Sequence, residues 1–348
     1  MYKKVVMSRF GGLGDMVMLT PILRGIKTLL PETKLIVVGE ENARALMEGC
    51  PFVDEYLGFD KSYKSSWNII KKLWRADIVY LMDTLYRISI IYWLARVKKR
   101  IGFPHKRKFF LTDLISAKSW MNYAYEPVVY ADFVKDILQI DITQIPEWDS
   151  LFYPEGSELE KKNVIELLQH RRYKDFIVCS LETGGYPKDW PIEHWLELFR
   201  ELEKIEKSVV IIGVPSKKYN DIEFPDNVLD LRGRTNLLET GEVIRLADMV
   251  VNGCSFPIHV ANAVNTPVIG LYGSEPDWRC RPQRIFASIC AEMDCSPCDY
   301  MFKGPGWCEN PICMKQISVK RVITEIQRCY DEGKPLGEYR LITGENDG

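Results

Sequence analysis

The chain has 348 residues, of which 46% are hydrophobic and 27% charged, and its formal net charge is −2. This composition excludes a disordered or fibrous protein, and the length leaves room for two domains with separate cores. No run approaches the ~20 apolar residues that cross a bilayer, and the first residues lack the pattern of a secretory signal. We therefore expect a cytoplasmic protein that at most touches the cytoplasmic face of a membrane, and we expect no nucleic-acid partner.

The first half of the chain alternates between strand and helix patterns. Strands are predicted at 5–7, 34–39, 55–59 and 76–81, with an extended segment at 100–103. Helices are predicted from residue 16 onward and at 41–48, 62–75 and 87–97. Alternation at this spacing predicts βαβ units, and hence a parallel sheet with helices on both faces. Residues 104–160 lose the alternation, and there we expect a helix near 130–138 and the interdomain connection around 149–156.

The alternation resumes after a predicted helix at 159–171. Further strands are predicted at 175–181, 208–213, 228–231, 249–252 and 267–272. Further helices are predicted at 192–205, 237–246, 257–263 and 319–330. The fold class is therefore α/β, with two Rossmann-like, doubly wound domains that face a cleft. We assign them to residues 1–155 and 156–330 and expect a polar, fraying tail at 331–348. Ligands of such sheets bind at the carboxyl ends of the strands.

A glycine-rich turn follows the first strand. It contains Gly11, Gly12 and Gly14, and Asp15 lies where a carboxylate can cap the next helix or point into a cleft. The dinucleotide fingerprint requires glycine or alanine where Val17 stands, so a nicotinamide-dependent dehydrogenase is disfavoured. A tight turn needs only one or two glycines, and three beside an aspartate favour close approach by a ligand.

The segment 86–112 carries eight Lys or Arg residues and no Asp or Glu. One interpretation is the solvated basic surface of a helix and the strand that follows it. The other is a landing area for an anionic substrate or for membrane headgroups, because the apolar run 90–94 accompanies the charges.

Two loops of the second half have the composition of ligand sites. The loop from Thr183 to Lys188 holds two glycines and precedes a helix with Pro191 near its start. A hydroxyl, free amides and an ammonium group suit a phosphate, although a solvated surface loop would have the same composition. His259 falls on the first turn of another helix, where a structural role and a role in the cleft are both open.

Six of the ten cysteines lie within the Cys-rich loop 280–313. Four of them, with the spacing C-x2-C-x9-C-x4-C, are Cys295, Cys298, Cys308 and Cys313. Four thiolates can close a tetrahedral zinc or iron site, which would brace the loop structurally. Reduced structural thiols and disulfides are the alternatives.

Three stretches together resemble the ADP-heptose:lipopolysaccharide heptosyltransferase family, glycosyltransferase family nine. They read GGLGDMVMLTPILRGIK, TGGYPKDWPIEHW and RTNLLETGEVIRLADMVVNGCSFPIHVANAVNTPVIGLYGSEPDW, and the resemblance covers roughly residues 3–328. It implies the two-domain GT-B fold. It also implies inverting transfer of a heptose or related sugar from a nucleotide-diphosphate donor, ADP-linked in this family, to a hydroxyl of a lipopolysaccharide-type glycolipid or a protein.

The resemblance also implies roles for individual residues. Asp15 matches the carboxylate taken as general base in the acceptor-binding first domain. Thr183 and Lys188 match residues that hold the donor's phosphates, and Ser255 and His259 match the segment that contacts the donor. No metal or other cofactor is expected for catalysis, because Lys188 and helix N-termini can stabilise the departing diphosphate.

One stretch departs from the family pattern. The family usually has Asp-Ser/Thr-Gly where this chain has Cys254, Ser255 and Phe256. The carboxylate that contacts the donor is absent, and the phenyl ring narrows the space for the sugar, so a different nucleotide sugar is an open alternative. A second hypothesis is a catalytically impaired GT-B scaffold that binds a nucleotide sugar or glycan, which the intact Asp15, Lys188 and His259 oppose.

Overall fold

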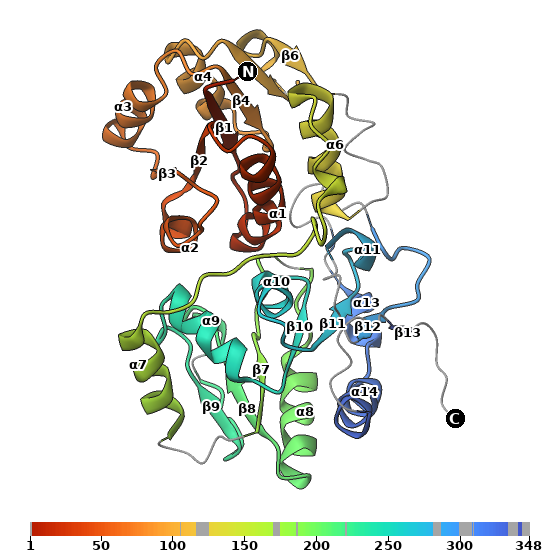
Figure 1. Ribbon diagram of the computed structural model, residues 1–348. Helices are drawn as coiled ribbons and strands as arrows, with labels where there is room; N and C mark the ends of the chain where they lie inside the picture. The colour runs from red at the N-terminus through yellow and green to blue at the C-terminus, as the bar shows by residue number, and fades with distance from the viewer. Residues whose placement is uncertain are drawn as a thin grey trace. The chain divides into compact units, whose positions relative to one another are not determined.

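The computed structural model describes residues 2–104, 106–115, 125–169, 175–185, 187–219, 221–280, 287–298, 308, 310–332 and 340–342. The chain divides into two compact units, Met1–Pro154 and Glu155–Gly348 (Figure 1). Each unit contains one sheet whose described strand pairs are all parallel, with helices packed against it. The predicted α/β class with two Rossmann-like sheets is confirmed. Within the described residues, no helix combines the length and the apolar character that a membrane span requires.

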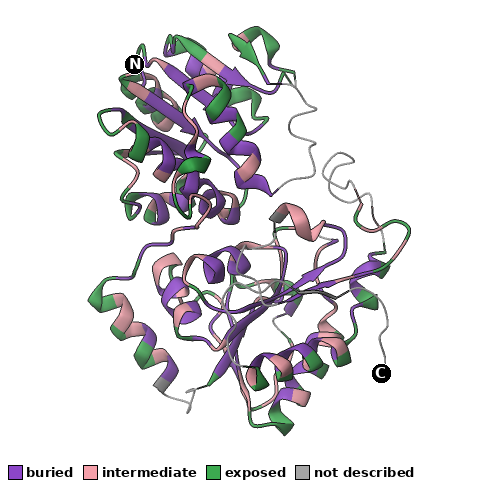
Figure 2. Ribbon diagram, turned by 45° about the vertical axis from the view of Figure 1, so that its right-hand side comes forward, coloured by how far each residue is buried: buried purple, intermediate pink, exposed green. Residues whose placement is uncertain are grey.

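Unit 1 contains a six-stranded sheet in the order β3-β2-β1-β4-β5-β6. Its strands are β1 (Lys4–Ser8), β2 (Lys34–Glu40), β3 (Glu55–Phe59), β4 (Ile78–Leu81), β5 (Lys99–Gly102) and β6 (Asp113–Leu114). Its helices are α1 (Leu13–Leu29), α2 (Arg44–Glu48), α3 (Tyr63–Lys72), α4 (Tyr86–Leu94) and α6 (Glu126–Leu138), and its 3-10 turns are η1 (Glu41–Ala43), η2 (Lys108–Phe110) and η3 (Ile142–Gln144). The central strands β1, β2 and β4 are buried over most of their length (Figure 2) and carry mainly apolar residues, as expected where both faces of a parallel sheet are covered.

Two features of unit 1 differ from the sequence prediction. Helix α6 begins at Glu126, about one turn before the predicted start near residue 130, because Pro127 occupies a position in the first turn where its missing N–H costs nothing. The two-residue strand β6 extends the sheet beyond residue 104, where the alternation was judged to end. The acidic and apolar pair Asp113–Leu114 is too short for a period to be read from it.

Unit 2 contains a seven-stranded sheet in the order β13-β12-β11-β10-β7-β8-β9. Its strands are β7 (Phe176–Cys179), β8 (Ser208–Ile211), β9 (Val228–Asp230), β10 (Met249–Gly253), β11 (Val268–Tyr272), β12 (Ala287–Cys290) and β13 (Arg340–Ile342). Its helices are α7 (Glu158–Gln169), α8 (Ile192–Lys204), α9 (Leu237–Leu246), α10 (Phe256–Ala263), α11 (Asp277–Cys280), α13 (Ile312–Gln316) and α14 (Val319–Asp331), with the 3-10 turn η4 (Lys217–Tyr219).

The two strands at one edge of this sheet correct the sequence prediction. Residues 287–290 form β12 inside the segment expected to be a Cys-rich loop, and residues 340–342 form β13 inside the expected polar tail. Strand β12 pairs in parallel with β11 and leaves its other edge open, and β13 takes the hydrogen bonds of that edge. A strand of three or four residues is stabilised by its neighbours and has little local signature.

In each sheet the strand order reverses at one point. In unit 1 the chain runs outward through β2 and β3 on one side of β1 and through β4 and β5 on the other. In unit 2 it runs through β8 and β9 on one side of β7 and through β10 and β11 on the other. The loops after β1 and β4, and those after β7 and β10, therefore flank the switch points where open parallel sheets bind ligands.

Candidate functional site

The glycine turn after β1 is shaped around Asp15. The Asp15 Oδ2 atom accepts a hydrogen bond of 2.8 Å from the Gly12 N–H, which caps the start of α1. Gly11 has a φ of +155°, and a Cβ atom there would lie 2.2 Å from Asp15 Oδ2. Gly14 is buried in the first turn of the helix. Only glycine therefore fits at position 11, and the space it leaves is taken by the carboxylate itself.

Arg9 holds the other oxygen of Asp15. Its Nη2 atom lies 3.0 Å from Asp15 Oδ1 and 2.9 Å from Glu126 Oε1, and the Tyr130 hydroxyl donates to the same Glu126 oxygen. Burial disfavours the charged guanidinium, but the neighbouring carboxylates raise the pKa of Arg9 well above its ordinary value. One buried cation thus fixes Asp15 and anchors α6 to the end of β1. Neither Arg9 nor Glu126 was among the residues predicted from the sequence, although an arginine directly after a buried strand is a usable signal.

A second ion pair lies on the other side of the switch point, after β4. Asp83 Oδ1 is 3.3 Å from Arg107 Nη1 and accepts 2.8 Å from the Leu85 N–H, and Ser8 Oγ donates to Asp83 Oδ2 at 3.4 Å. The Asp83 side chain is 3% exposed and that of Arg107 is 0% exposed. Burial raises the pKa of Asp83, and the positive charges of Arg107 and Arg9 oppose that rise.

The exposure of the two aspartates separates their roles. The Asp15 side chain keeps 23% of its surface accessible, whereas Asp83 is enclosed with its counter-ion. An acid–base group must reach the proton that it takes. Of these two carboxylates, Asp15 is the one that a ligand at the switch point can contact, and Asp83 is enclosed with Arg107.

In unit 2, the loop after β7 is organised by Asp189. The Thr183 N–H and Oγ1–H both donate to Asp189 Oδ1, at 2.7 and 2.9 Å. A Cβ atom added at Gly184 or Gly185 would meet no atom within 4 Å, so packing does not demand glycine there. The amides of Thr183, Gly185 and Lys188 donate to partners within residues 183–189, so the feature that suits a phosphate is the open space beside the two glycines.

Lys188 and Glu275 bring a charge pair to the same edge of the sheet. The Lys188 side chain is 15% exposed, and its Nζ atom lies 4.0 Å from Oε1 of Glu275, whose side chain is 6% exposed. Glu275 follows β11, two strands away from β7 in the sheet. The loop from Thr183 to Lys188 also fits against β10, because a Cβ atom at Gly253 would lie 3.1 Å from Thr183 Cγ2.

Asn252 joins the two loops at the switch point of unit 2. Its side-chain oxygen accepts 2.6 Å from the Ser180 N–H, and its amide nitrogen donates 2.7 Å to Ser255 Oγ. Asn252 is fully buried at the end of β10, and Ser255 is the N-cap of α10. This contact holds the end of β7 against the start of α10. The sequence analysis quoted Asn252 within a motif but assigned it no role.

The remaining predicted donor residues surround the start of α10. Cys254 is buried in the turn, and Phe256 is half-buried as the first residue of the helix. His259 lies near the start of α10, as the sequence predicted, and its side chain is buried. The structure therefore brings the predicted residues of unit 2 to one edge of its sheet, while Gly11, Gly12, Gly14 and Asp15 belong to unit 1.

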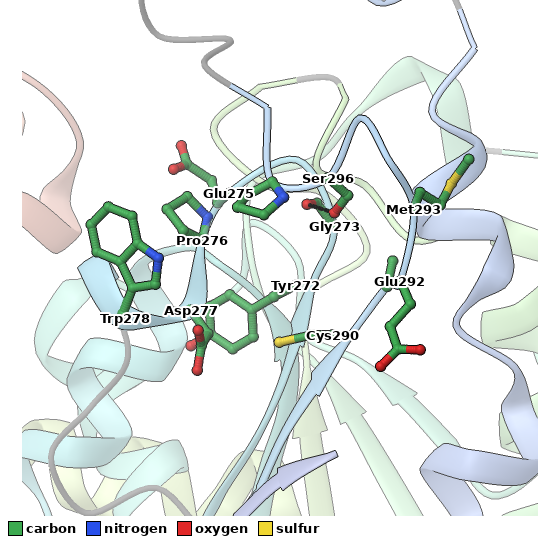
Figure 3. A pocket seen from close by; sticks show the side chains of 12 residues that line it. Tyr272, Gly273, Glu275, Pro276, Asp277, Trp278, Cys290, Glu292, Met293 and Ser296 are labelled. Carbon is green, nitrogen blue, oxygen red and sulfur yellow. Dashed lines mark hydrogen bonds between the residues drawn. The ribbon is translucent and has the colours of Figure 1, made fainter. Parts of the chain in front are cut away.

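A pocket of about 400 Å³ lies at the carboxyl ends of β11 and β12 (Figure 3). Trp278 and Asp277 lie on one side of it, Glu292 and Met293 on the other, and Glu275 belongs to its wall. The wall therefore carries three carboxylates and an indole ring. This combination suits a polyhydroxylated ligand, because carboxylates accept hydrogen bonds from hydroxyls and a ring covers an apolar face.

The four cysteines with metal-ligand spacing lie close enough to influence one another's ionisation. Burial, together with the nearby thiols of Cys308 and Cys295, raises the pKa of Cys298, and burial raises that of Cys313 to about 11. The described cysteines, apart from the side chain of Cys280, are free thiols. The donor set has zinc or iron chemistry. Even so, the described residues include no group of three or more Cys, His, Asp or Glu that could hold an ion. The chemistry below uses no metal at these cysteines.

Comparisons with known proteins point to one family. Residues 66–302 match the model of the family described as glycosyltransferase family 9 (heptosyltransferase). The chain is 24% identical over 293 residues to the lipopolysaccharide core heptosyltransferase OpsX of Haemophilus influenzae, covering 80% of this chain and 82% of that protein.

Solved structures agree in fold. A family 9 glycosyl transferase from Veillonella parvula superimposes with a TM-score of 0.77 at 18% identity, covering 95% of this chain and 98% of that one. The ADP-heptose lps heptosyltransferase II of Escherichia coli gives a TM-score of 0.73 at 20% identity, covering 95% of this chain and all of that one. These likenesses show that the fold is GT-B.

Proposed function

Because the chain belongs to glycosyltransferase family 9, we propose that it is an inverting enzyme that transfers a heptose or related sugar from an ADP-linked donor. That the chain is a glycosyltransferase follows from its family. The proposed acceptor is a hydroxyl of a lipopolysaccharide-type glycolipid, in keeping with the name of the relative from Haemophilus influenzae, and a protein acceptor is the alternative. The observation that carries the proposal is the partly exposed carboxylate of Asp15 at the switch point of unit 1.

The proposed reaction is a single displacement. The Asp15 carboxylate takes the proton of the acceptor hydroxyl as its oxygen attacks the anomeric carbon of the sugar. The bond from that carbon to the diphosphate oxygen breaks, and the nucleotide diphosphate leaves with the electron pair. One displacement inverts the configuration at carbon and needs only one base. Asp15 is held for this task by Gly12 and Arg9, so its orientation does not depend on the substrate.

The proposed donor site lies at the edge of unit 2. In this proposal the Lys188 ammonium faces the charge that develops on the departing diphosphate, and the N-terminus of α10 adds its dipole. These groups supply the stabilisation that a divalent cation provides in other enzymes, so no cofactor is part of the proposal. Cys254 and Phe256 replace the family's usual acidic and small residues, so the proposed donor site has no carboxylate at the start of α10.

A screen of nucleotide sugars tests the proposal. We expect ADP-linked sugars to raise the melting temperature of the full chain more than UDP- or GDP-linked ones, and transfer to a lipid A-containing acceptor to follow. Stabilisation by a nucleotide sugar without transfer or hydrolysis would favour the second hypothesis, a binding scaffold, to which Cys254 and Phe256 point. Stabilisation by none of the nucleotides would contradict both.

Replacing Lys188 by alanine is expected to weaken ADP binding by about tenfold to a hundredfold, because a charge-assisted contact to phosphate contributes about 1.5–3 kcal/mol. Isothermal titration calorimetry measures the change. Lys204→Ala is the matched control, since Lys204 lies on the exposed surface of α8 and pairs only with Glu201 among the described contacts. An unchanged affinity of the Lys188 variant would remove this residue from the phosphate site.

A further inference from the structure

Exposed aromatic side chains are concentrated in one segment of unit 1. Among the described residues, every large aromatic side chain that is exposed lies between residues 63 and 109. They are Tyr63, Trp67, Trp74, Tyr86, Trp93 and Phe109. Tyr63 is 90% exposed and Phe109 81% exposed, so these rings are not the margin of a core. A concentration of this kind on a folded domain marks an interaction surface.

The elements that carry these rings adjoin one another. Helices α3 and α4 contact each other, and α4 also contacts η2. Ile69 of α3 and Ile88 of α4 enter the same cluster with Val6 and Leu81 of the sheet, so both helices cover one face of it. The outer side of this single layer is the aromatic–basic face, defined here as the exposed side chains of α3, α4, η2 and their connecting turns.

The face is strongly basic. Residues 61–112 contain thirteen Lys or Arg, two Asp and no Glu. Asp83 is buried with Arg107, and Asp77 is bound by Lys98 and by the backbone amides of residues 3 and 4. Lys72 pairs with Glu55 at 2.8 Å, and Asp60 lies just before the segment. Among the described ion pairs, none involves Lys64 or Lys71, so the charge of these two cations is left uncompensated by a direct ion pair.

Cations and rings are interleaved on this face. Lys71 Nζ lies 5.5 Å from the centre of the Trp67 ring, and the Arg96 guanidinium lies 5.3 Å from that of Trp74. Exposed aliphatic side chains accompany them at Leu85 and Leu94. Tryptophan and tyrosine prefer the headgroup region of a bilayer, and basic residues are attracted to its anionic lipids. Leucines can enter the acyl boundary but cannot stack on nucleic-acid bases, which favours a lipid surface.

We propose that the aromatic–basic face docks the protein on a bilayer that carries anionic headgroups. The docking itself stands on exposure and charge alone. Its purpose, to bring a membrane-embedded glycolipid acceptor to Asp15, rests on the proposed function. The structure corrects the sequence interpretation of this region: Ile91 and Tyr92 of the apolar run are buried in the core, and α3, outside the basic segment, contributes two of the aromatic rings.

Vesicle co-sedimentation with the full chain tests the proposal. We expect binding to vesicles of mixed phosphatidylcholine and phosphatidylglycerol, little binding to phosphatidylcholine alone, and a loss of binding as salt is raised. Lys64→Glu with Lys71→Glu should weaken binding by about fivefold or more for each residue. Lys162→Glu with Lys204→Glu, on the exposed sides of α7 and α8, makes the same change in net charge and should bind like the wild type.

A second pair of variants tests the aromatic contribution. Trp67→Ser with Trp93→Ser should weaken vesicle binding by about tenfold or more at fixed salt, whereas Leu159→Ser on exposed α7 should leave it unchanged. The docking proposal would be overturned if the two lysine double variants lost vesicle binding equally. It would also be overturned if the double tryptophan variant bound vesicles as the wild type does. Binding of a single-stranded oligonucleotide in place of vesicles would overturn it too.

The same experiments separate docking from function. Vesicle binding by a protein that transfers no sugar would retain the docking surface and reject the proposed function. If the protein transfers sugar to a detergent-dispersed acceptor but does not bind anionic vesicles, the proposed function is retained and the docking surface is rejected.

Discussion

Replacing Asp15 by asparagine is expected to lower the rate of sugar transfer by about a hundredfold to ten-thousandfold, the range that a positioned general base contributes. The asparagine oxygen can still accept the Gly12 N–H, and Arg9 keeps Glu126, so the start of α1 should keep its conformation. ADP affinity should change little, because the proposed nucleotide site belongs to unit 2. The measurements are kcat for transfer and calorimetric titration with ADP.

Glu126→Gln is the informative control for this variant, because Glu126 is the other carboxylate of Arg9. If Asp15 only held Arg9 in place, both variants would lose activity to a similar degree. If Asp15 takes the proton, the loss in Asp15→Asn exceeds that in Glu126→Gln by at least tenfold. Undiminished turnover of Asp15→Asn would exclude Asp15 as the base.

Replacing Arg107 by methionine is expected to lower the free energy of unfolding at neutral pH by about 3–5 kcal/mol, the cost of leaving a buried charge without its partner. Asp83 would then be stabilised only by the more distant charge of Arg9 and by the hydrogen bonds that Asp83 itself accepts. Denaturant unfolding measures the loss. Arg87→Met, at an exposed position over the Phe59 ring, should cost at most about 1 kcal/mol.

The loss in Arg107→Met should also depend on pH. Burial already raises the pKa of Asp83, and removing Arg107 raises it further. Between the ordinary carboxyl pKa and this raised value the folded state binds more protons than the unfolded state, so stability falls as pH rises through that window. The loss of unfolding free energy in Arg107→Met should therefore depend on pH. It should be smaller near pH 5, about one unit above the ordinary carboxyl pKa, than near pH 8, which is well above it. Adding Asp83→Asn to the variant should recover part of it, and a deficit independent of pH would contradict this account of the pair.

Local patterns were sufficient to predict the loops that matter. Gly11–Asp15 and Thr183–Lys188 each follow a short apolar strand and precede a helix. These features are local, because each is contained in a few consecutive residues. The same spacing indicated parallel sheets, because a crossover helix is required between parallel neighbours. The structure confirmed the alternation and moved most element boundaries by a few residues only.

Partners that are distant in sequence could not be predicted. Arg9 and Glu126 are 117 residues apart, and their contact requires α6 to lie beside the end of β1. Strand β12 and strand β13 were missed because their stability comes from the adjacent edge of a sheet. Neither the pairing of strands nor the packing of a helix is set by local composition.

The sequence by itself placed the proposed site residues on strand-to-helix loops and showed that one segment is unusually basic. Only the tertiary structure decided which carboxylate is accessible, because burial with Arg107 removes Asp83 from contact with ligands and leaves Asp15 half-open. It also decided which rings face solvent, since α4 is apolar on nearly all sides and its packing on the sheet covers Tyr92 but not Trp93. Burial is a property of the assembled layers, and a local pattern fixes it only when one side of an element is clearly polar.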